Sequence, residues 1–327
     1  MKKKILMLIV LAIVLTATIS CKPKEQVEEV VLDRFTLEEY NLDVDEGKIY
    51  GTLTLPKGEG PFTMALIIQG SGPTDRNGNS GLAGKNNSLK MISEALVDEN
   101  IASLRYDKRG IGESKGLVKK EEDLVFEDYI EDVKLWIEKI KSDGRFNKIV
   151  VIGHSEGALI GAAATQDSQV DGYVSVAGAG ENIYNVLGRQ LKAQSEEVYN
   201  MSIPIMEELK KGNLVPTVEE GLYMLFRPSV QPYMISWFKY DPVEVISKIH
   251  VPILILQGDN DLQVTVADAE RLHEAVSSEL VIVKGMNHVL KDAPTDSEGN
   301  LGTYNDPTLE LNQEFKEKLI EFIKGLE

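Results

Sequence analysis

Short apolar runs recur along this chain of 327 residues, and longer segments with a different spacing separate them. Residues 64–68, 149–152 and 253–256 are apolar at successive positions, which is typical of strands buried on both faces of a sheet. The same pattern predicts further strands over residues 101–106, 173–177 and 280–283.

Between these runs, apolar residues recur every three or four positions, the spacing of one face of a helix. Phe126, Ile130, Val133, Ile137 and Ile140 mark the clearest of these helices. The patterns also predict helices over residues 89–96, 158–164, 266–276 and 311–322. Strands that alternate with helices in this way predict an α/β fold, with a mostly parallel central sheet covered by helices on both faces.

Two parts of the chain depart from this alternation. Residues 35–42 and 48–55 are extended segments around a turn near Gly47, and they predict an antiparallel edge to the sheet. Residues 181–240 contain no strand-like run, and prolines divide them into short helices.

We expect residues 181–240 to form a helical cap inserted in an α/β core made of residues 34–180 and 241–327. The cap segment is rich in aromatic and long apolar side chains. Most of them should pack the cap onto the core. Met234 and Trp237 are expected to line a substrate pocket.

The first 20 residues differ from the rest. Three lysines precede an apolar run over residues 5–15, an order typical of a secretory signal peptide rather than a membrane span. Residues 18–21 then resemble a bacterial lipobox, although the first two positions differ from the usual ones. We expect an exported lipoprotein attached to the membrane through a lipid on Cys21, with residues 21–33 as a polar tether. An ordinary cleaved signal or a signal anchor is the alternative.

The formal charge of −17 makes the chain strongly acidic. Because like charges repel, neither nucleic acid nor an anionic lipid surface is expected as a partner. Cys21 is the single cysteine, so the chain cannot form a disulfide within itself.

The sequence Gly153-His154-Ser155-Glu156-Gly157 lies between a predicted strand and a predicted helix. In this G-x-S-x-G arrangement a sharp turn holds the serine hydroxyl clear of the sheet, and the glycines leave room for the turn. A serine hydroxyl becomes an effective nucleophile only when a neighbouring base takes its proton. Ser155 is therefore the candidate nucleophile, and a purely structural turn is the alternative.

Four histidines limit the search for that base. His288 follows a predicted strand, and sites in parallel sheets gather at the carboxyl ends of the strands. His154 lies inside the turn and should point away from Ser155, while His250 and His273 are expected to be surface or structural residues. His288 is the predicted base.

A third group must hold the histidine in its reactive tautomer. Asp259 and Asp261 both follow a predicted strand directly. We choose Asp261, because the turn at Gly258 and two further residues carry it round to face the histidine loop. Asp259 stays open as the alternative.

Negative charge that develops on a substrate carbonyl oxygen needs N–H donors held in place. One should be the backbone N–H of Glu156, the residue after the nucleophile. The loop Gln69-Gly70-Ser71-Gly72-Pro73 follows another predicted strand, and its glycines allow close backbone approach. We assign the second donor to the Ser71 N–H, with a simple turn as the alternative.

A further motif, D-x-R-G-x-G-x-S, occupies residues 107–114. Together with residues 69–73, 153–157, 258–261 and 285–288, it resembles the α/β-hydrolase superfamily. The likeness is greatest to secreted or lipid-anchored bacterial carboxylesterases of the EstD type.

In that superfamily the nucleophile, the acid and the histidine follow one another as Ser155, Asp261 and His288 do. The segment 107–114 is characteristic of the family and is expected to be structural, shaping the loop beside the nucleophile. Gln69 stands where many relatives have histidine.

These features predict a serine hydrolase that cleaves carboxylic esters of short to medium acyl chains through an acyl-enzyme, with small-molecule substrates. No cofactor or metal is expected, because the histidines lack ligand spacing and the glycine-rich loops lack a following Lys-Ser/Thr. An aminopeptidase or acylpeptidase with the same triad is one alternative, in which an acidic side chain binds the substrate amine. The candidates for that acid are Glu156, Glu181, Glu207 and Glu208. A lipid-anchored binding protein without catalysis is the other alternative.

Overall fold

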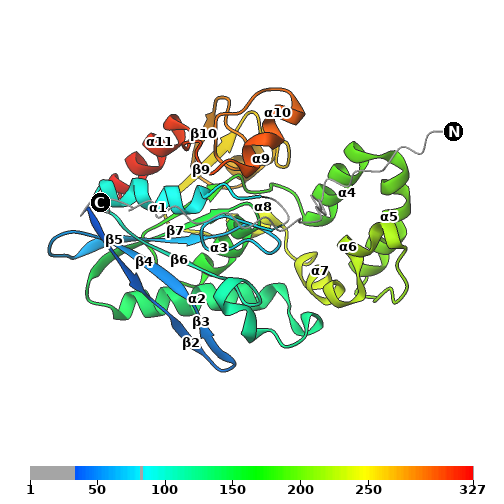
Figure 1. The fold of residues 1–327 in the computed structure, drawn as a ribbon, viewed down its shortest axis with the longest axis horizontal. Helices are drawn as coiled ribbons and strands as arrows, with labels where there is room; N and C mark the ends of the chain where they lie inside the picture. Colours follow the sequence, from blue (N-terminus) through cyan, green and yellow to red (C-terminus); the bar gives the residue numbers. More distant parts are fainter. Residues whose placement is uncertain (1–33, 82–83, 327) are drawn as a thin grey trace, which may run out of the picture.

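The computed structural model describes residues 34–81 and 84–326, so the predicted signal peptide, Cys21 and the whole predicted tether lie outside the described residues. A central sheet of eight strands runs in the order β1-β4-β6-β5-β7-β8-β9-β10 (Figure 1). These strands are β1 (Phe35–Glu39), β4 (Gly51–Pro56), β5 (Phe62–Ile68), β6 (Ala102–Tyr106), β7 (Phe146–His154), β8 (Gly172–Val176), β9 (Ile253–Gly258) and β10 (Glu279–Val283).

The six strands from β6 to β10 in this order are parallel, whereas β1 and β4 pair antiparallel at one edge. Consecutive apolar residues form the parallel strands because both faces are covered. In β5, Leu66 and Ile68 belong to the hydrophobic cluster on one face, and Ala65 and Ile67 belong to the cluster on the other. The predicted α/β fold is confirmed.

Helices cover the two faces as separate layers (Figure 1). α1 (Ser88–Asp98) and α11 (Gln313–Lys324) pack on one face. The opposite face is covered by α2 (Phe126–Ser142), α3 (Glu156–Gln166), α8 (Pro242–Ile246) and α9 (Val266–Ala275). Each of the helices predicted from apolar spacing is present, with boundaries shifted by a few residues.

The antiparallel edge is more divided than predicted. A separate ribbon of β2 (Leu42–Val44) and β3 (Gly47–Ile49) forms beside the β1–β4 pair. The break lies at Asn41, whose side-chain oxygen accepts the Gly51 N–H at 3.1 Å in place of a backbone partner. A side chain that competes for backbone hydrogen bonds in this way interrupts a strand ladder.

The segment between β8 and α8 forms four α-helices and two short 3-10 helices, with a hydrophobic cluster of their own. The α-helices are α4 (Ile183–Gln194), α5 (Glu196–Lys210), α6 (Tyr223–Phe226) and α7 (Gln231–Trp237). In Figure 1 this cap projects from one end of the sheet. Asn182 joins its two ends, because the side-chain amide donates to the carbonyls of Phe238 and Tyr240 at 2.8 and 2.9 Å.

α7 connects the cap to the core. The ring of Trp237 stacks on Phe126 of α2 with centroids 5.6 Å apart, and the Phe126 N–H donates to the Ser236 hydroxyl at 2.8 Å. Arg227 pairs with Glu121 nearby. The remaining short helices are η1 (Gly112–Leu117), η2 (Glu121–Asp123), η3 (Glu220–Leu222), η4 (Pro228–Val230), α10 (Ser297–Gly302) and η5 (Thr303–Asn305).

Among the helices of residues 34–81 and 84–326, none is long and apolar enough to cross a membrane.

Burial of Trp136 on α2 predicts a large loss of stability on truncation. Its side chain is fully buried, with its ring 5.4 Å from that of Tyr106. We expect Trp136→Ala to lower the free energy of unfolding by about 3–5 kcal/mol, because the change leaves a cavity. The neighbouring Leu135 is 45% exposed, so Leu135→Ala should change it by less than about 0.5 kcal/mol. Urea titrations measure both, and similar losses at the two positions would contradict the packing described.

Candidate active site

Ser155 forms the whole connection between a strand and a helix. β7 ends at His154, α3 begins at Glu156, and Ser155 between them has φ 56° and ψ −121°. A non-glycine residue with positive φ is strained and persists only where neighbours hold it. Here the Ser155 N–H donates to the Val176 carbonyl at 2.9 Å, and its carbonyl accepts the Ala158 N–H at 3.0 Å.

Close backbone contacts explain the glycines on either side of Ser155. A Cβ on Gly153 would lie 2.2 Å from the Gly157 carbonyl oxygen, and a Cβ on Gly157 would lie 2.5 Å from the Ile68 carbonyl oxygen. Neither distance is sterically possible without moving backbone. The G-x-S-x-G spacing therefore follows from pressing the first turn of α3 against both β7 and the end of β5.

Three predicted residues form one hydrogen-bonded chain. The His288 Nε2 lies 3.1 Å from the Ser155 hydroxyl, and the His288 Nδ1 lies 2.7 Å from an Asp261 carboxylate oxygen. His288 follows β10 and Asp261 follows β9, so both loops lie at the carboxyl ends of strands, as does Ser155 after β7. With a proton on Nδ1, the Nε2 lone pair can accept the serine proton.

Asp261, rather than Asp259, contacts the histidine. Its buried carboxylate also accepts the N–H groups of Gln263 and Val264 at 2.7 and 3.0 Å. Burial acts to raise the pKa of Asp261, but the charge of His288 and these hydrogen bonds outweigh it and lower the pKa below its usual value. Asp259 is exposed and accepts the Gly285 N–H at 2.6 Å. Asp261 is therefore held ionised and oriented toward the imidazole.

Asn287 fixes the loop that carries His288, and the sequence did not single it out. It is fully buried, and its side-chain oxygen accepts the N–H groups of Val289 and Lys291, each at 3.2 Å. Its amide nitrogen donates to Thr303 at 2.7 Å. The position of an asparagine directly before the candidate base was the one signal in the sequence that could have pointed to this role.

His154 has a supporting position that sequence reasoning also missed. It does not contact the Ser155 hydroxyl, but its Nε2 lies 2.8 Å from the His288 carbonyl oxygen, and the two rings are 4.9 Å apart. Since a carbonyl only accepts, the His154 Nε2 bears the proton. Burial lowers the pKa of His154 to about 4, and the charge of His288 acts in the same direction. His154 thus remains neutral and anchors the backbone of His288, the predicted base.

The two predicted oxyanion donors belong to segments that pass beside Ser155. Glu156 is the first residue of α3, where N–H groups lack partners within the helix. The glycine loop passes close by, because a Cβ on Gly70 would lie 3.0 Å from the Ser155 Cβ. Gln69 is buried and donates to the Tyr106 carbonyl at 2.8 Å, so its side chain anchors the loop that includes Ser71.

The two residues predicted to line a substrate pocket pack against other side chains. Met234 is buried within the hydrophobic cluster of the cap, and Trp237 stacks on Phe126. Their role as pocket lining stays a prediction. Tyr233, on the same helix α7, reaches the site instead. Its hydroxyl donates to the Glu156 carboxylate at 2.6 Å.

The other histidines and the acidic residues give no metal centre in the part of the chain that the structure describes. His250 and His273 are exposed. Within residues 34–81 and 84–326, no group of three or more His, Cys, Asp or Glu side chains is arranged to hold a metal ion.

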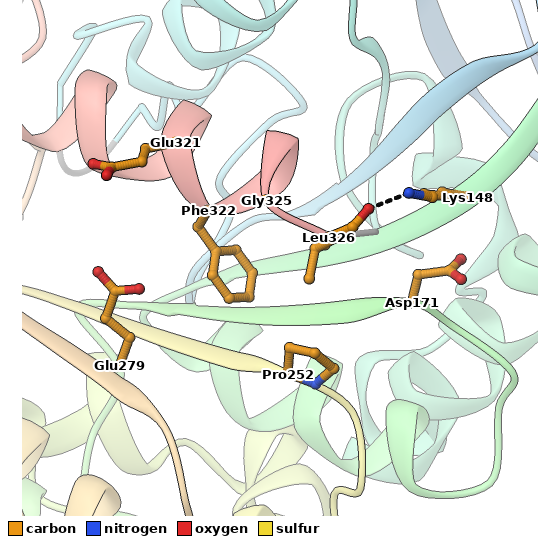
Figure 2. A pocket seen from close by; sticks show the side chains of 8 residues that line it. All are labelled: Lys148, Asp171, Pro252, Glu279, Glu321, Phe322, Gly325 and Leu326. Carbon is orange, nitrogen blue, oxygen red and sulfur yellow. Dashed lines mark hydrogen bonds between the residues drawn. The ribbon is translucent and has the colours of Figure 1, made fainter.

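A surface pocket of about 530 Å³ lies at the other end of the parallel strands from Ser155. Figure 2 shows its lining, in which Asp171 and Pro252 come just before β8 and β9, and Lys148 donates to the Leu326 carbonyl. These are the amino ends of the strands. Lys148 and Ser155 are separated by most of β7, about 20 Å at the rise of a strand. This pocket therefore takes no part in chemistry at Ser155.

The pKa of His154 predicts how stability depends on pH. Below pH 6.5 the unfolded chain protonates His154, whereas the folded protein does so only near pH 4. The free energy of unfolding should therefore fall as pH drops from 6.5 to 4, with up to about 3 kcal/mol due to this group. In His154→Gln, which keeps a side-chain N–H, this part of the pH dependence should disappear. Urea titrations across that range test it, and equal slopes in both proteins would refute it.

Comparison with known proteins gives distant relatives. The family model described as serine aminopeptidase, S33, matches residues 79–217. The esterase EstD of Thermotoga maritima is 29% identical over 264 residues, a match that covers 76% of this chain and 59% of that protein.

Solved structures resemble the chain over a larger share of its length. Est1E from Butyrivibrio proteoclasticus, with ferulic acid bound, has a TM-score of 0.60 at 18% identity and covers 88% of this chain and 98% of its own. An esterase from Pyrococcus furiosus has a TM-score of 0.58 at 18% identity, and the match covers 89% of this chain and 91% of that esterase. With the sheet order and the Ser155 turn described above, these similarities show that the chain has the α/β-hydrolase fold.

Proposed function

We propose that this protein is a serine esterase that hydrolyses carboxylic esters of short to medium acyl chains. The observation that supports it most is the hydrogen-bonded chain from Ser155 through His288 to Asp261. The similarity of this protein to EstD, which is named an esterase, also supports the proposal.

In the proposed reaction the Ser155 oxygen attacks the acyl carbon while the His288 Nε2 takes its proton. The N–H groups of Ser71 and Glu156 would donate to the oxyanion that forms. The imidazolium then protonates the leaving alkoxide, so that the C–O bond breaks and the alcohol departs. Water attacks the acyl-enzyme in the same way, with His288 as base, and the acid product leaves as Ser155 regains its proton. Asp261 holds the Nδ1 proton and stabilises the imidazolium throughout.

The matching family model is described as an aminopeptidase, so the two substrate classes need to be weighed. An aminopeptidase needs a carboxylate for the substrate ammonium. Each of the four sequence candidates already has a partner: Glu156 contacts Lys108 and Tyr233, Glu181 contacts Arg189 and Arg271, Glu207 contacts Tyr184, and Glu208 contacts Lys211. These pairings favour a neutral ester over a charged amine.

Loss of the nucleophile should abolish ester turnover. We expect Ser155→Ala to lower kcat/KM for p-nitrophenyl esters by about 10⁴–10⁶-fold, as expected when a serine nucleophile is removed. The assay uses p-nitrophenyl esters of increasing acyl length alongside aminoacyl p-nitroanilides. Faster turnover of the anilides would favour the aminopeptidase, and turnover of neither would favour a binding protein.

The two neighbouring aspartates provide a matched pair. Asp261→Asn should lower kcat by about 10⁴-fold, because an amide opposite Nδ1 favours the wrong tautomer of His288. Asp259→Asn should lower it by less than about fivefold, since the exposed Asp259 side chain accepts the Gly285 N–H and does not bind His288, whose Nδ1 contacts Asp261. Steady-state kinetics on one ester decides, and a larger effect at Asp259 would overturn the assignment of the acid.

A further inference from the structure

A buried ion pair lies directly beside the nucleophile, and the triad does not use it. The side chains of Lys108 and Glu156 are 1% and 2% exposed, and the ammonium nitrogen lies 2.8 Å from a carboxylate oxygen. Lys108 follows β6, and Glu156 is the first residue of α3. Removing two charges from water costs about as much as their attraction returns, so such a pair is weak evidence for stability alone.

The Lys108 ammonium has a second partner that gives it a different purpose. It donates to the Gly70 carbonyl oxygen at 2.8 Å. That oxygen and the Ser71 N–H belong to one planar peptide group, which is trans. In a trans peptide the C=O and the N–H point in opposite directions. Holding the Gly70 oxygen on one side therefore sets the direction of the Ser71 N–H on the other.

The ammonium is itself held from several sides. Glu156 neutralises its charge, and the other oxygen of that carboxylate accepts the Tyr233 hydroxyl at 2.6 Å. The ring of Tyr129 faces the ammonium, with the nitrogen 4.7 Å from its centroid. A cation confined in this way keeps the peptide fixed and also polarises it, which strengthens the N–H as a donor.

We infer that Lys108 is a positioning residue of the oxyanion hole, which aims the Ser71 N–H at the substrate oxygen through the Gly70 carbonyl, with Glu156 as its counter-charge. The inference rests on the proposed function, because the direction of this N–H matters only where a negatively charged oxygen forms. It gives the segment 107–114 a role in the reaction beyond shaping a loop.

The test removes the ammonium without leaving a buried charge. Lys108→Met alone would leave the buried Glu156 carboxylate without its counter-charge and could prevent folding. The informative variant is therefore Lys108→Met/Glu156→Gln, which is neutral at both positions and keeps a hydrogen-bond partner for Tyr233. We expect its kcat for p-nitrophenyl esters to fall by about 10- to 100-fold with KM within about threefold, because the hole acts on the transition state. The rate at which a fluorophosphonate phosphonylates Ser155, measured by intact mass, should fall by a similar factor.

A neighbouring ion pair, with a buried carboxylate and a partly buried guanidinium, serves as the control. Arg109 and Asp132 form it, with the guanidinium 2.8 Å from the carboxylate, and neither contacts Gly70. Arg109→Met/Asp132→Asn should leave both rates within about threefold of wild type. Equal losses in the two double variants, or no loss in the first, would overturn the inference while leaving the esterase proposal standing. If the wild type is phosphonylated but hydrolyses no ester, the esterase proposal fails, and the two phosphonylation rates still decide the role of Lys108.

Discussion

Close packing of the turn at Ser155 against β5 is the constraint on which the rest of the site depends. The contacts at Gly153 and Gly157 leave no space for a side chain, so the strand and helix meet at a single strained residue. The same packing places Gly70, which follows β5, against Ser155. The proposed nucleophile and the loop of a proposed oxyanion donor are thus brought together by backbone contacts, before the side chains of the proposed triad are considered.

His288 and Asp261, the proposed base and acid, are buried and held by hydrogen bonds. β9 and β10 end beside one another, and their loops bring Asp261 and His288 into contact. The loop that carries His288 is then fixed by two buried polar side chains: Asn287 accepts two backbone N–H groups that follow it in the loop, and His154 donates to the His288 carbonyl. Buried polar groups with all their partners make a loop rigid, which catalysis by preorganised groups requires.

The sheet and three residues of the site could be predicted from the sequence, because the signals that mark them come from neighbouring residues in the chain. Strands buried on both faces must be apolar at successive residues, and site residues must follow such strands, so Ser155, Asp261 and His288 could be found from their neighbours. Lys108 could not, because a buried lysine is recognised only by its partners, and Glu156 lies 48 residues further along the chain. Tyr233 was missed for the same reason, since which cap side chain turns toward the core depends on packing between distant helices.

Glu156 links the cap to the reaction machinery. Its backbone N–H is at the site, its carboxylate neutralises Lys108, and the same carboxylate accepts a hydrogen bond from Tyr233 of α7. Burial raises the pKa of Tyr233 well above its usual value, so its hydroxyl remains protonated and always donates. A movement of α7 away from the core would therefore break a buried hydrogen bond at the residue next to Ser155. The cap and the loop that carries the proposed Ser71 donor are therefore linked through one carboxylate, because Glu156 binds Tyr233 on one side and, on the other, the Lys108 ammonium that donates to the Gly70 carbonyl.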